Sequence, residues 1–499
     1  MPFNYEERGA FPAPIYRDTV LAPIFADARR YFLDPLIEVE YAHTLMLARQ
    51  GVMPRAEAAR CIGALRSLDL DAVRRAEYDG SFEDLFFYVE KLLAEACGAE
   101  IAGKMHTARS RNDIDLTMYR MLLRQRLLQI LASLLRLRAR LIALAKEHIG
   151  SLMPGYTHNQ PAQPTTLAHF LMAYIEVLER DAERIQAAYG RVNRNPLGAC
   201  AITTTGFPID RSYTEKLLGF SGLQVNSYGA IAAVDYVAES SSVLAVSMLS
   251  MGRFVQDLLL WSTAEFGYLR LSDSYVQISS IMPQKRNPVA LEHVRILASR
   301  AWMQAQGILG CLHNTPFADM NDAEDELQPL VYAAFQDAQR GVILLGGVLD
   351  EASFNTDRMA AAADSHFLSV TELADTLVRT TEMSFHAAHA IVSRAVRAMD
   401  GVYEPARMAV IVERELAALP DAQISREQIL LALSATNFVA VRKVPGGPAA
   451  EAMRPEIARA ERQLETDSAW ANGVSESLER ARTMLQEHCD SLVRQAGER

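Results

Sequence analysis

The 499-residue sequence lacks the features of a secreted, membrane-spanning or disulfide-rich protein. Its five cysteines are scattered, with no CxxC pair, so the sequence predicts neither a disulfide framework nor a zinc site. The longest apolar runs, such as GVILLGGVL at 341–349, are too short to cross a bilayer. The first residues, MPFNYEERGAF, show neither the basic nor the apolar region of a secretory signal. We therefore expect reduced thiols, a cytoplasmic location and no membrane partner.

The sequence also has fewer basic residues, 50 Lys and Arg, than acidic residues, 61 Asp and Glu. The formal net charge is -11, which argues against general affinity for nucleic acid or for anionic membranes. An anionic ligand would need a local concentration of cationic groups. There is no glycine-rich phosphate loop between a strand and a helix, and no cluster of metal-ligand residues, so we expect no cofactor and no metal.

Strand-like alternation is scarce, and long stretches without glycine or proline take its place. The segment from Ile114 to Ile149 contains neither residue, and leucine recurs along it at helical spacing. Similar patterns cover 165–189, 230–251 and 289–306. These segments predict an all-α protein with a central bundle of long helices, the first spanning roughly 50 Å.

The two ends of the chain differ from this centre. Residues 1–113 mix short helical stretches with loops, and the helical segments after about 365 are again shorter, with a Pro/Gly break at 443–456. The sequence therefore predicts three domains, with boundaries 1–113, 114–365 and 366–499. When helices are longer than the thickness of one domain, part of their apolar surface stays uncovered. Self-association is a common way to cover such a surface.

The first of three dense polar clusters is HTARSRND at 106–113, directly before the longest predicted helix. Ser110 and Asn112 supply hydroxyl and amide groups, and Arg111 supplies a guanidinium suited to carboxylates. The backbone amides of a helix start add to such an anion site. The alternative is a capping and solvation cluster.

The second cluster is PGYTHNQPAQPTT at 154–166. Its prolines and glycine fix the backbone between two long helices and present Thr157 and His158, as rigid binding loops do. A lone histidine is more often a structural hydrogen-bonding group than a catalyst.

The third cluster is SSIMPQKRNP at 279–288, with Asn287 expected as a helix N-cap and Pro288 as the first helical residue. An ordinary surface loop would explain a serine pair. Ser279, Ser280 and Lys285 beside a helix start instead suggest a pocket for negative charge that develops during a reaction.

Together the clusters resemble those of the argininosuccinate lyase branch of the aspartase/fumarase superfamily, over nearly the whole chain. SSIMPQKRNP is similar to the superfamily signature loop, PGYTHNQPAQP to the branch's Thr-His region, and HTARSRND to its Ser-Arg-Asn region. The resemblance implies a homotetramer around a twenty-helix core, with four active sites that each take the three regions from three subunits. It implies reversible elimination of an amine from an N-substituted aspartate, releasing fumarate, with these small molecules as partners.

The resemblance also implies roles for single residues. Ser279 would be the general base, which requires nearby backbone amides and Lys285 to stabilise its alkoxide. His158, paired with Glu292, would orient the site or relay protons. The groups that hold carboxylates would be Ser110, Arg111, Asn112, Thr157, Ser280, Lys285 and Asn287. Asp84 matches a position associated with the leaving amine.

One segment departs from the branch. In TPFADMNDAEDELQPL at 315–330, the positions at which argininosuccinate lyases carry Tyr, Gln and Lys are Asp319, Glu324 and Leu327. An acidic rim attracts a cationic amine and repels a carboxylate. The sequence therefore favours an aminopolycarboxylate substrate such as ethylenediaminedisuccinate. The alternatives are argininosuccinate, another N-succinyl amine, a fumarate-adding biosynthetic lyase, a silent structural homologue like the lens crystallins of this family, or a nonenzymatic helical interaction protein.

Overall fold

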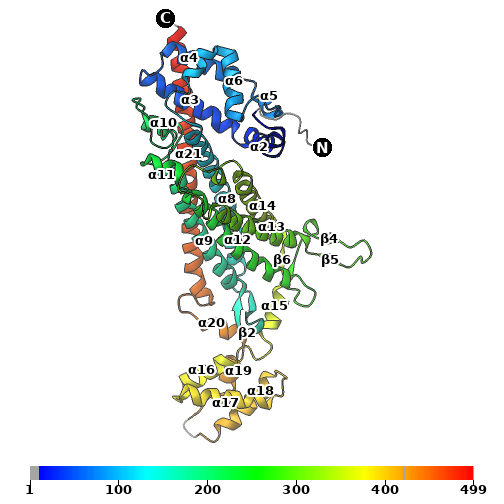
Figure 1. Cartoon of the computed structure of the whole chain (residues 1–499). Coiled ribbons are helices and arrows are strands. Elements are labelled where there is room, and N and C mark those ends of the chain that lie inside the picture. The colour runs from blue at the N-terminus through cyan, green and yellow to red at the C-terminus, as the bar shows by residue number, and fades with distance from the viewer. Residues whose placement is uncertain (1–10, 420–421, 498–499) are drawn as a thin grey trace.

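The computed structural model describes residues 11–419 and 422–497, and it is built almost entirely of helices (Figure 1). The opening segment, in which the sequence shows no secretory signal, lies outside the described residues except for Phe11. The all-α prediction is confirmed.

Five long helices form the central bundle: α8 (Arg111–Glu147), α9 (Leu167–Val192), α12 (Asp235–Trp261), α13 (Val289–Leu312) and α14 (Gln328–Glu351). Four of them overlap the ranges expected from periodicity: α13 extends its range, α8 begins earlier than expected, and α9 and α12 begin and end later. The fifth, α14, is an addition. At 37 residues, α8 is about 55 Å long. Its buried side chains recur around much of its circumference, because other helices pack on several sides of it.

Shorter helices gather at the end of the bundle where α8 begins (Figure 1). They are α1 (Pro14–Tyr16), a π-helical turn (Arg17–Leu21), α2 (Ala22–Tyr31), α3 (Leu33–Arg49), α4 (Arg55–Ser67), α5 (Leu70–Arg75), α6 (Leu85–Cys97) and α7 (Ala99–Lys104). Two further short helices, α10 (Arg211–Leu217) and α11 (Ser227–Ala232), lie towards the same end of the structure in Figure 1.

The C-terminal part of the chain contributes to two separate hydrophobic cores. Buried residues between Leu373 and Leu433 form a small core of their own, whereas Met453, Ile457 and Leu485 of α21 (Ala450–Gly497) belong to the core of the bundle. The small core lies in the lobe at the bottom of Figure 1, built from α16 (Val370–Thr381), α17 (Phe385–Ala398), α18 (Pro405–Leu416) and α19 (Arg426–Ala432). Between lobe and bundle lie α15 (Thr356–Ala363) and α20 (Ala435–Ala440). The boundaries of the three domains remain a prediction. In the structure, α21 packs along the central bundle.

One bundle helix is long and apolar enough to cross a membrane by length and composition. This is α12, and half of its most apolar window is buried inside the structure. It packs against α9 and α13, and core helices of soluble proteins pass the same test. The sequence predicted that no apolar stretch is long enough to cross a membrane. By length and composition alone, α12 is an exception to this prediction.

Three small antiparallel pairs interrupt the helices: β1 (Leu152–Thr157) with β2 (Gln160–Thr166), β3 (Leu269–Arg270) with β6 (Ser353–Phe354), and β4 (Gln277–Ile278) with β5 (Arg286–Asn287). The second polar cluster is therefore a hairpin. The third forms a hairpin loop, and the N-cap prediction at its end is wrong. Pro288 occupies the N-cap of α13, because Asn287 is paired in β5 and cannot turn into the helix.

Candidate active site

The first polar cluster caps the start of α8. Ser110 is the N-cap, its backbone N–H donates to Asp113 Oδ1 at 2.9 Å, and its hydroxyl donates to Asn112 Oδ1 at 2.9 Å. The capping interpretation is thus part of the answer, since a capping box begins the helix. The Asn112 side chain still turns outward, donating to Asp319 Oδ2 at 2.7 Å and to the Ala201 carbonyl at 3.2 Å.

Asp113 fixes this helix start to a second segment. Its Oδ2 accepts the backbone N–H groups of Gly198 at 2.7 Å and Cys200 at 2.9 Å. Burial raises the pKa of Asp113 to about 6, although these amide donors counteract the effect. The carboxylate therefore holds the 198–201 segment, including the Ala201 carbonyl, against Asn112.

A buried ion pair anchors the first polar cluster to the protein core. Arg109 Nη1 donates to Glu40 Oε2 at 2.8 Å, and both side chains are 2% exposed. Beside them, His43 Nε2 lies 2.9 Å from the Thr107 carbonyl, and burial followed by repulsion from Arg109 lowers the pKa of His43 to about 3. This imidazole is neutral at pH 7, so its Nε2–H donates to the carbonyl.

Arg111, expected to hold a substrate carboxylate, is bound to acids of its own chain. Its Nη1 lies 2.7 Å from Asp84 Oδ2 and 3.2 Å from Glu83 Oε1. Burial alone would lower the pKa of Arg111, but the bonds to Asp84 and Glu83 outweigh it and hold the pKa above its ordinary value. Arg111 therefore counters negative charge within the site.

Further carboxylates surround Arg111 and Asn112. Burial raises the pKa of Glu324 to about 8, helped by a hydrogen bond with Asp319. Burial also raises the pKa of Asp325, whose Oδ1 accepts the Tyr119 hydroxyl at 2.7 Å, and raises that of Asp115 well above its usual range. Asp325, Asp84 and Glu324 all repel the Asp115 charge. The structure therefore brings the predicted Asp84, Asp319 and Glu324 to the start of α8.

Three members of this group, Asp115, Tyr119 and Asp325, were not predicted from the sequence. The signal was present, because Arg111, Asp115 and Tyr119 are spaced at i, i+4 and i+8 and so share one face of α8. We use the name acidic pocket for Asp84, Asp115, Asp319, Glu324 and Asp325.

The second cluster lies at the tip of the β1–β2 hairpin. Thr157 pairs with Gln160, and His158 and Asn159 form the two-residue turn with φ of 50° and 59°. Left-handed backbone at both positions matches a turn type that suits a hairpin's twist. The turn presents Thr157 and His158 to solvent, and no hydrogen bond within the described residues occupies the His158 ring.

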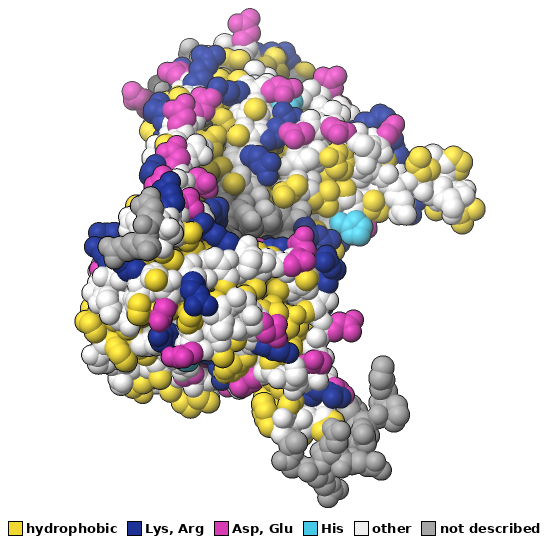
Figure 2. Space-filling model, turned by 90° about the horizontal axis from the view of Figure 1, so that it is seen from above, with side chains coloured by type: hydrophobic (Ala, Val, Ile, Leu, Met, Phe, Trp, Pro, Cys, Tyr) yellow, Lys and Arg dark blue, Asp and Glu magenta, His cyan; other side chains and the backbone are white. Residues whose placement is uncertain are grey.

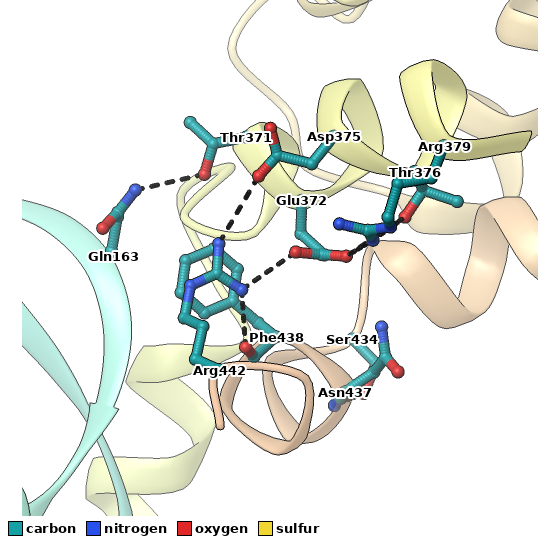
Figure 3. Close-up of polar contacts among 10 residues, drawn as sticks. All are labelled: Gln163, Thr371, Glu372, Asp375, Thr376, Arg379, Ser434, Asn437, Phe438 and Arg442. Carbon is teal, nitrogen blue, oxygen red and sulfur yellow. Dashed lines mark hydrogen bonds and ion pairs between the residues drawn. The ribbon is translucent and has the colours of Figure 1, made fainter. Parts of the chain in front are cut away.

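The C-terminal lobe supports this hairpin (Figure 3). Gln163 of β2 donates to the Thr371 hydroxyl of α16 at 3.2 Å. The next residue, Glu372, is 1% exposed and is paired with Arg379 and with Arg442, the latter at 2.9 Å. Arg379 lies on α16 with Glu372, whereas Arg442 follows α20, so the Glu372–Arg442 pair joins the two chain segments that connect the lobe to the bundle.

The third cluster spans the loop between β4 and β5, which stands away from the body as an arm in Figure 2. Ser279 Oγ accepts the backbone N–H groups of Met282 at 3.1 Å and of Ile281 at 3.4 Å. These are the kind of amide donors that an alkoxide requires. Lys285 and Ser280 are exposed, and Asn287 is half-buried in β5.

The three clusters are far apart within one chain. Ser110 begins α8 and Thr157 follows its other end, so the length of this helix, about 55 Å, separates them. Glu292 is exposed in the first turn of α13, and within the described residues no hydrogen bond or ion pair joins it to His158. A site that combines the three clusters would therefore need further copies of the chain.

Comparison with known proteins decides the family. A protein-family model for lyases matches residues 39–302, and one for the C-terminal region of argininosuccinate lyase matches residues 367–440. Argininosuccinate lyase 2 of Agrobacterium fabrum is 42% identical over 460 residues, 90% of each chain. The argininosuccinate lyase of Methanoculleus marisnigri is 39% identical over 454 residues, 91% of this chain and 92% of its own.

The chain belongs to the argininosuccinate lyase branch of the aspartase/fumarase superfamily. It is a carbon–nitrogen lyase. Among solved structures, ethylenediaminedisuccinate (EDDS) lyase in complex with formate is similar to it with a TM-score of 0.86 and 32% identity, over 95% of this chain and 96% of the other. An EDDS lyase variant with bound fumarate matches with a TM-score of 0.85 and the same identity, over 98% and 97%. The nonenzymatic interpretation is thereby set aside.

Two features of this lyase bear on its cofactor and assembly predictions. In the described part of the chain, no group of three or more His, Cys, Asp and Glu side chains has the arrangement to hold a metal ion. A cavity of about 810 Å³ opens between α9, α12 and α13, lined by apolar side chains such as Leu249, Trp302 and Met303. Such an apolar face is what a subunit interface would cover.

Proposed function

We propose that this lyase eliminates a cationic amine from an N-substituted aspartate, an aminopolycarboxylate such as ethylenediaminedisuccinate, and releases fumarate. The observation that carries the proposal is the acidic pocket beside Asn112. Its five acidic side chains lie around Arg111, and burial together with repulsion between neighbouring acids raises the pKa of Asp115 and of Glu324. A leaving amine with a second ammonium group would stabilise the ionised forms of these acids, whereas the carboxylate of an arginine moiety would be repelled.

In this proposal Ser279 removes a proton from the carbon next to a substrate carboxylate. The carbon's electron pair then forms the double bond of fumarate as the carbon–nitrogen bond breaks on the opposite face, and the nitrogen leaves with those bonding electrons. The Met282 and Ile281 amides stabilise the serine oxygen before the transfer. Lys285, Asn287, Ser280, Thr157, Ser110 and Asn112 hold the carboxylates whose charge grows in the transition state.

His158 and Glu292 are proposed to form a pair across two subunits that orients the site or relays protons. The active unit would be a homotetramer around a twenty-helix core, with each site taking the three clusters from three subunits. The length of α8 supports this arrangement, because the clusters that flank this helix lie about 55 Å apart in one chain and cannot meet there. A cytoplasmic location and the absence of a cofactor complete the proposal.

Argininosuccinate lyase activity is the second candidate, and a specific observation favours it. The chain is 42% identical to argininosuccinate lyase 2 of Agrobacterium fabrum and 32% identical to EDDS lyase. Both reactions release fumarate, so the proposed roles of Ser279 and the carboxylate-binding residues hold for either. The candidates differ only in what the acidic pocket receives.

One assay separates the candidates. The purified protein is mixed with fumarate and ethylenediamine, and separately with argininosuccinate, while fumarate is followed by its ultraviolet absorbance. The proposal expects fumarate consumption with the diamine and none with Ser279→Ala. Turnover of argininosuccinate alone would replace the proposal by the second candidate. Silence with both would leave another N-succinyl amine as the substrate, or a silent structural homologue.

Subunit sharing has its own test. Ser279→Ala and Asn112→Ala are each expected to be inactive, but subunits mixed after dissociation and reassociation should recover activity, because some sites then receive both intact clusters. Mixtures as inactive as their parents would contradict the shared site.

A further inference from the structure

A second cavity lies at the base of the Ser279 loop. It encloses about 490 Å³ and is lined by residues at the end of α12, by β3 and β6, and by the starts of α13 and α15. Among the described residues, three arginines line it, Arg270, Arg286 and Arg358, and no acidic side chain does. The proposed roles of the loop do not use this cavity.

The three guanidinium groups are not equally engaged. Arg286 is paired with Asp273 and also donates to the Leu271 carbonyl at 2.8 Å. Within the part of the chain that the structure describes, the Arg358 guanidinium donates to the backbone carbonyls of Ala264 and Glu265, which carry no formal charge. Arg270 is exposed, and its guanidinium forms no hydrogen bond or ion pair with any described residue. The three guanidinium groups carry three positive charges, and Asp273 balances one of them, so the net positive charge around the cavity is two.

Backbone geometry adds to this positive character. Gly267, with φ of 57°, leaves room for the Arg358 guanidinium, since a Cβ there would lie 3.2 Å from Arg358 Nη1. Pro288 and Asn355 also line the cavity, at the N-caps of α13 and α15. The N-terminal ends of helices favour anions.

We propose that this cavity binds a small dianion, a phosphate or a dicarboxylate, between Arg270, Arg286 and Arg358. Two negative charges match the unpaired excess, and both anions accept hydrogen bonds from guanidinium groups. Arg286 begins β5, whose pairing with β4 closes the loop that carries Ser279 and Lys285. A bound dianion therefore fixes the base of that loop, and the site regulates the loop without touching substrate.

Binding is measured by titration calorimetry on the full chain, with inorganic phosphate and with succinate as separate probes. We expect a Kd below about 1 mM for at least one probe. Arg270→Gln should weaken it at least tenfold, because this side chain has no structural partner to lose. The matched control is Arg397→Gln, an exposed arginine on α17 that should leave the Kd unchanged.

Succinate can also enter a fumarate site, so Lys285→Ala separates the two sources of its signal. Binding that survives Lys285→Ala and is lost in Arg270→Gln belongs to the cavity. Trypsin supplies the second readout, since it cleaves after Lys285 and Arg286. The bound probe should slow this cleavage at least threefold in the wild type and not in Arg270→Gln.

Equal binding by the wild type and Arg270→Gln overturns the proposal, as does the absence of binding by either probe. A dicarboxylate that binds while phosphate does not identifies a carboxylate site, and the reverse identifies a phosphate site. The result does not depend on which amine the enzyme releases.

Discussion

The start of α8 and the loop between β4 and β5 carry two of the proposed parts of one active site, yet they are built in opposite ways. The start of α8 rests on the buried Glu40–Arg109 pair and on Asp113, whose carboxylate accepts three backbone amides. The loop is exposed, and Arg286 anchors its base. One region is fixed and acidic, whereas the other is open and cationic.

The difference suggests a division of labour. Selection between amines requires carboxylates at fixed positions, so the acidic pocket is placed on a supported helix start. A loop that closes over substrate must first admit it, so few contacts can hold the loop when the site is empty.

The largest effect is expected at the loop. Ser279→Ala removes the proposed base and should lower kcat by about a thousandfold or more, because general-base contributions reach this size. Steady-state rates of fumarate release measure it. Ser475→Ala, on an exposed face of α21, is the control and should keep full activity. Activity within tenfold of the wild type would exclude Ser279 as the base.

The second effect concerns the support of the fixed region. Glu40→Gln leaves the Arg109 guanidinium buried without its ion pair and should lower the free energy of unfolding by about 3 kcal/mol. Glu461→Gln breaks the exposed pair with Lys146 and should lower it by less than about 1 kcal/mol. Urea unfolding of both variants gives the comparison. Equal losses would show that the helix start is not specially supported.

The third effect lies in the acidic pocket. Asp319→Asn should raise KM for a diamine by about 10- to 100-fold, because a hydrogen bond to a charged group is lost. The KM for fumarate should change much less. Asp322→Asn, three residues away on an exposed position, is the matched control. Loss of both affinities together would mean that Asp319 supports the fold rather than the amine.

The smallest effect is a pH dependence of stability. Burial and Asp319 raise the pKa of Glu324 from 4.5 to about 8, so the folded protein retains a proton that the unfolded chain loses. This group's stabilising contribution is therefore greatest below pH 4.5 and is lost as the pH rises towards 8. Glu324→Gln should melt close to the wild type at pH 5 and at a higher temperature than the wild type at pH 8.5. Parallel curves at the two pH values would contradict the assignment.

The sequence predicted the helical bundle because its periodicity is local and long. It also predicted the acids at 319 and 324, since a family resemblance fixed their positions. It did not predict Asp115 and Asp325 as partners, because their proximity follows from the packing of α8 against the start of α14. The Asn287 cap was wrong for a similar reason: pairing with Gln277 across a hairpin overrides a local capping preference. Local signals thus give the elements, and packing decides which side chains meet.

The most direct test of the acidic pocket compares two nucleophiles that differ in one charged group. Ethylenediamine carries a second amine, and ethanolamine has a hydroxyl in its place. With fumarate as the common substrate, the account predicts a kcat/KM at least about 30-fold higher for ethylenediamine, falling towards equality in the Asp319→Asn and Asp325→Asn variants. Equal kcat/KM values for the two amines in the wild-type enzyme would contradict it.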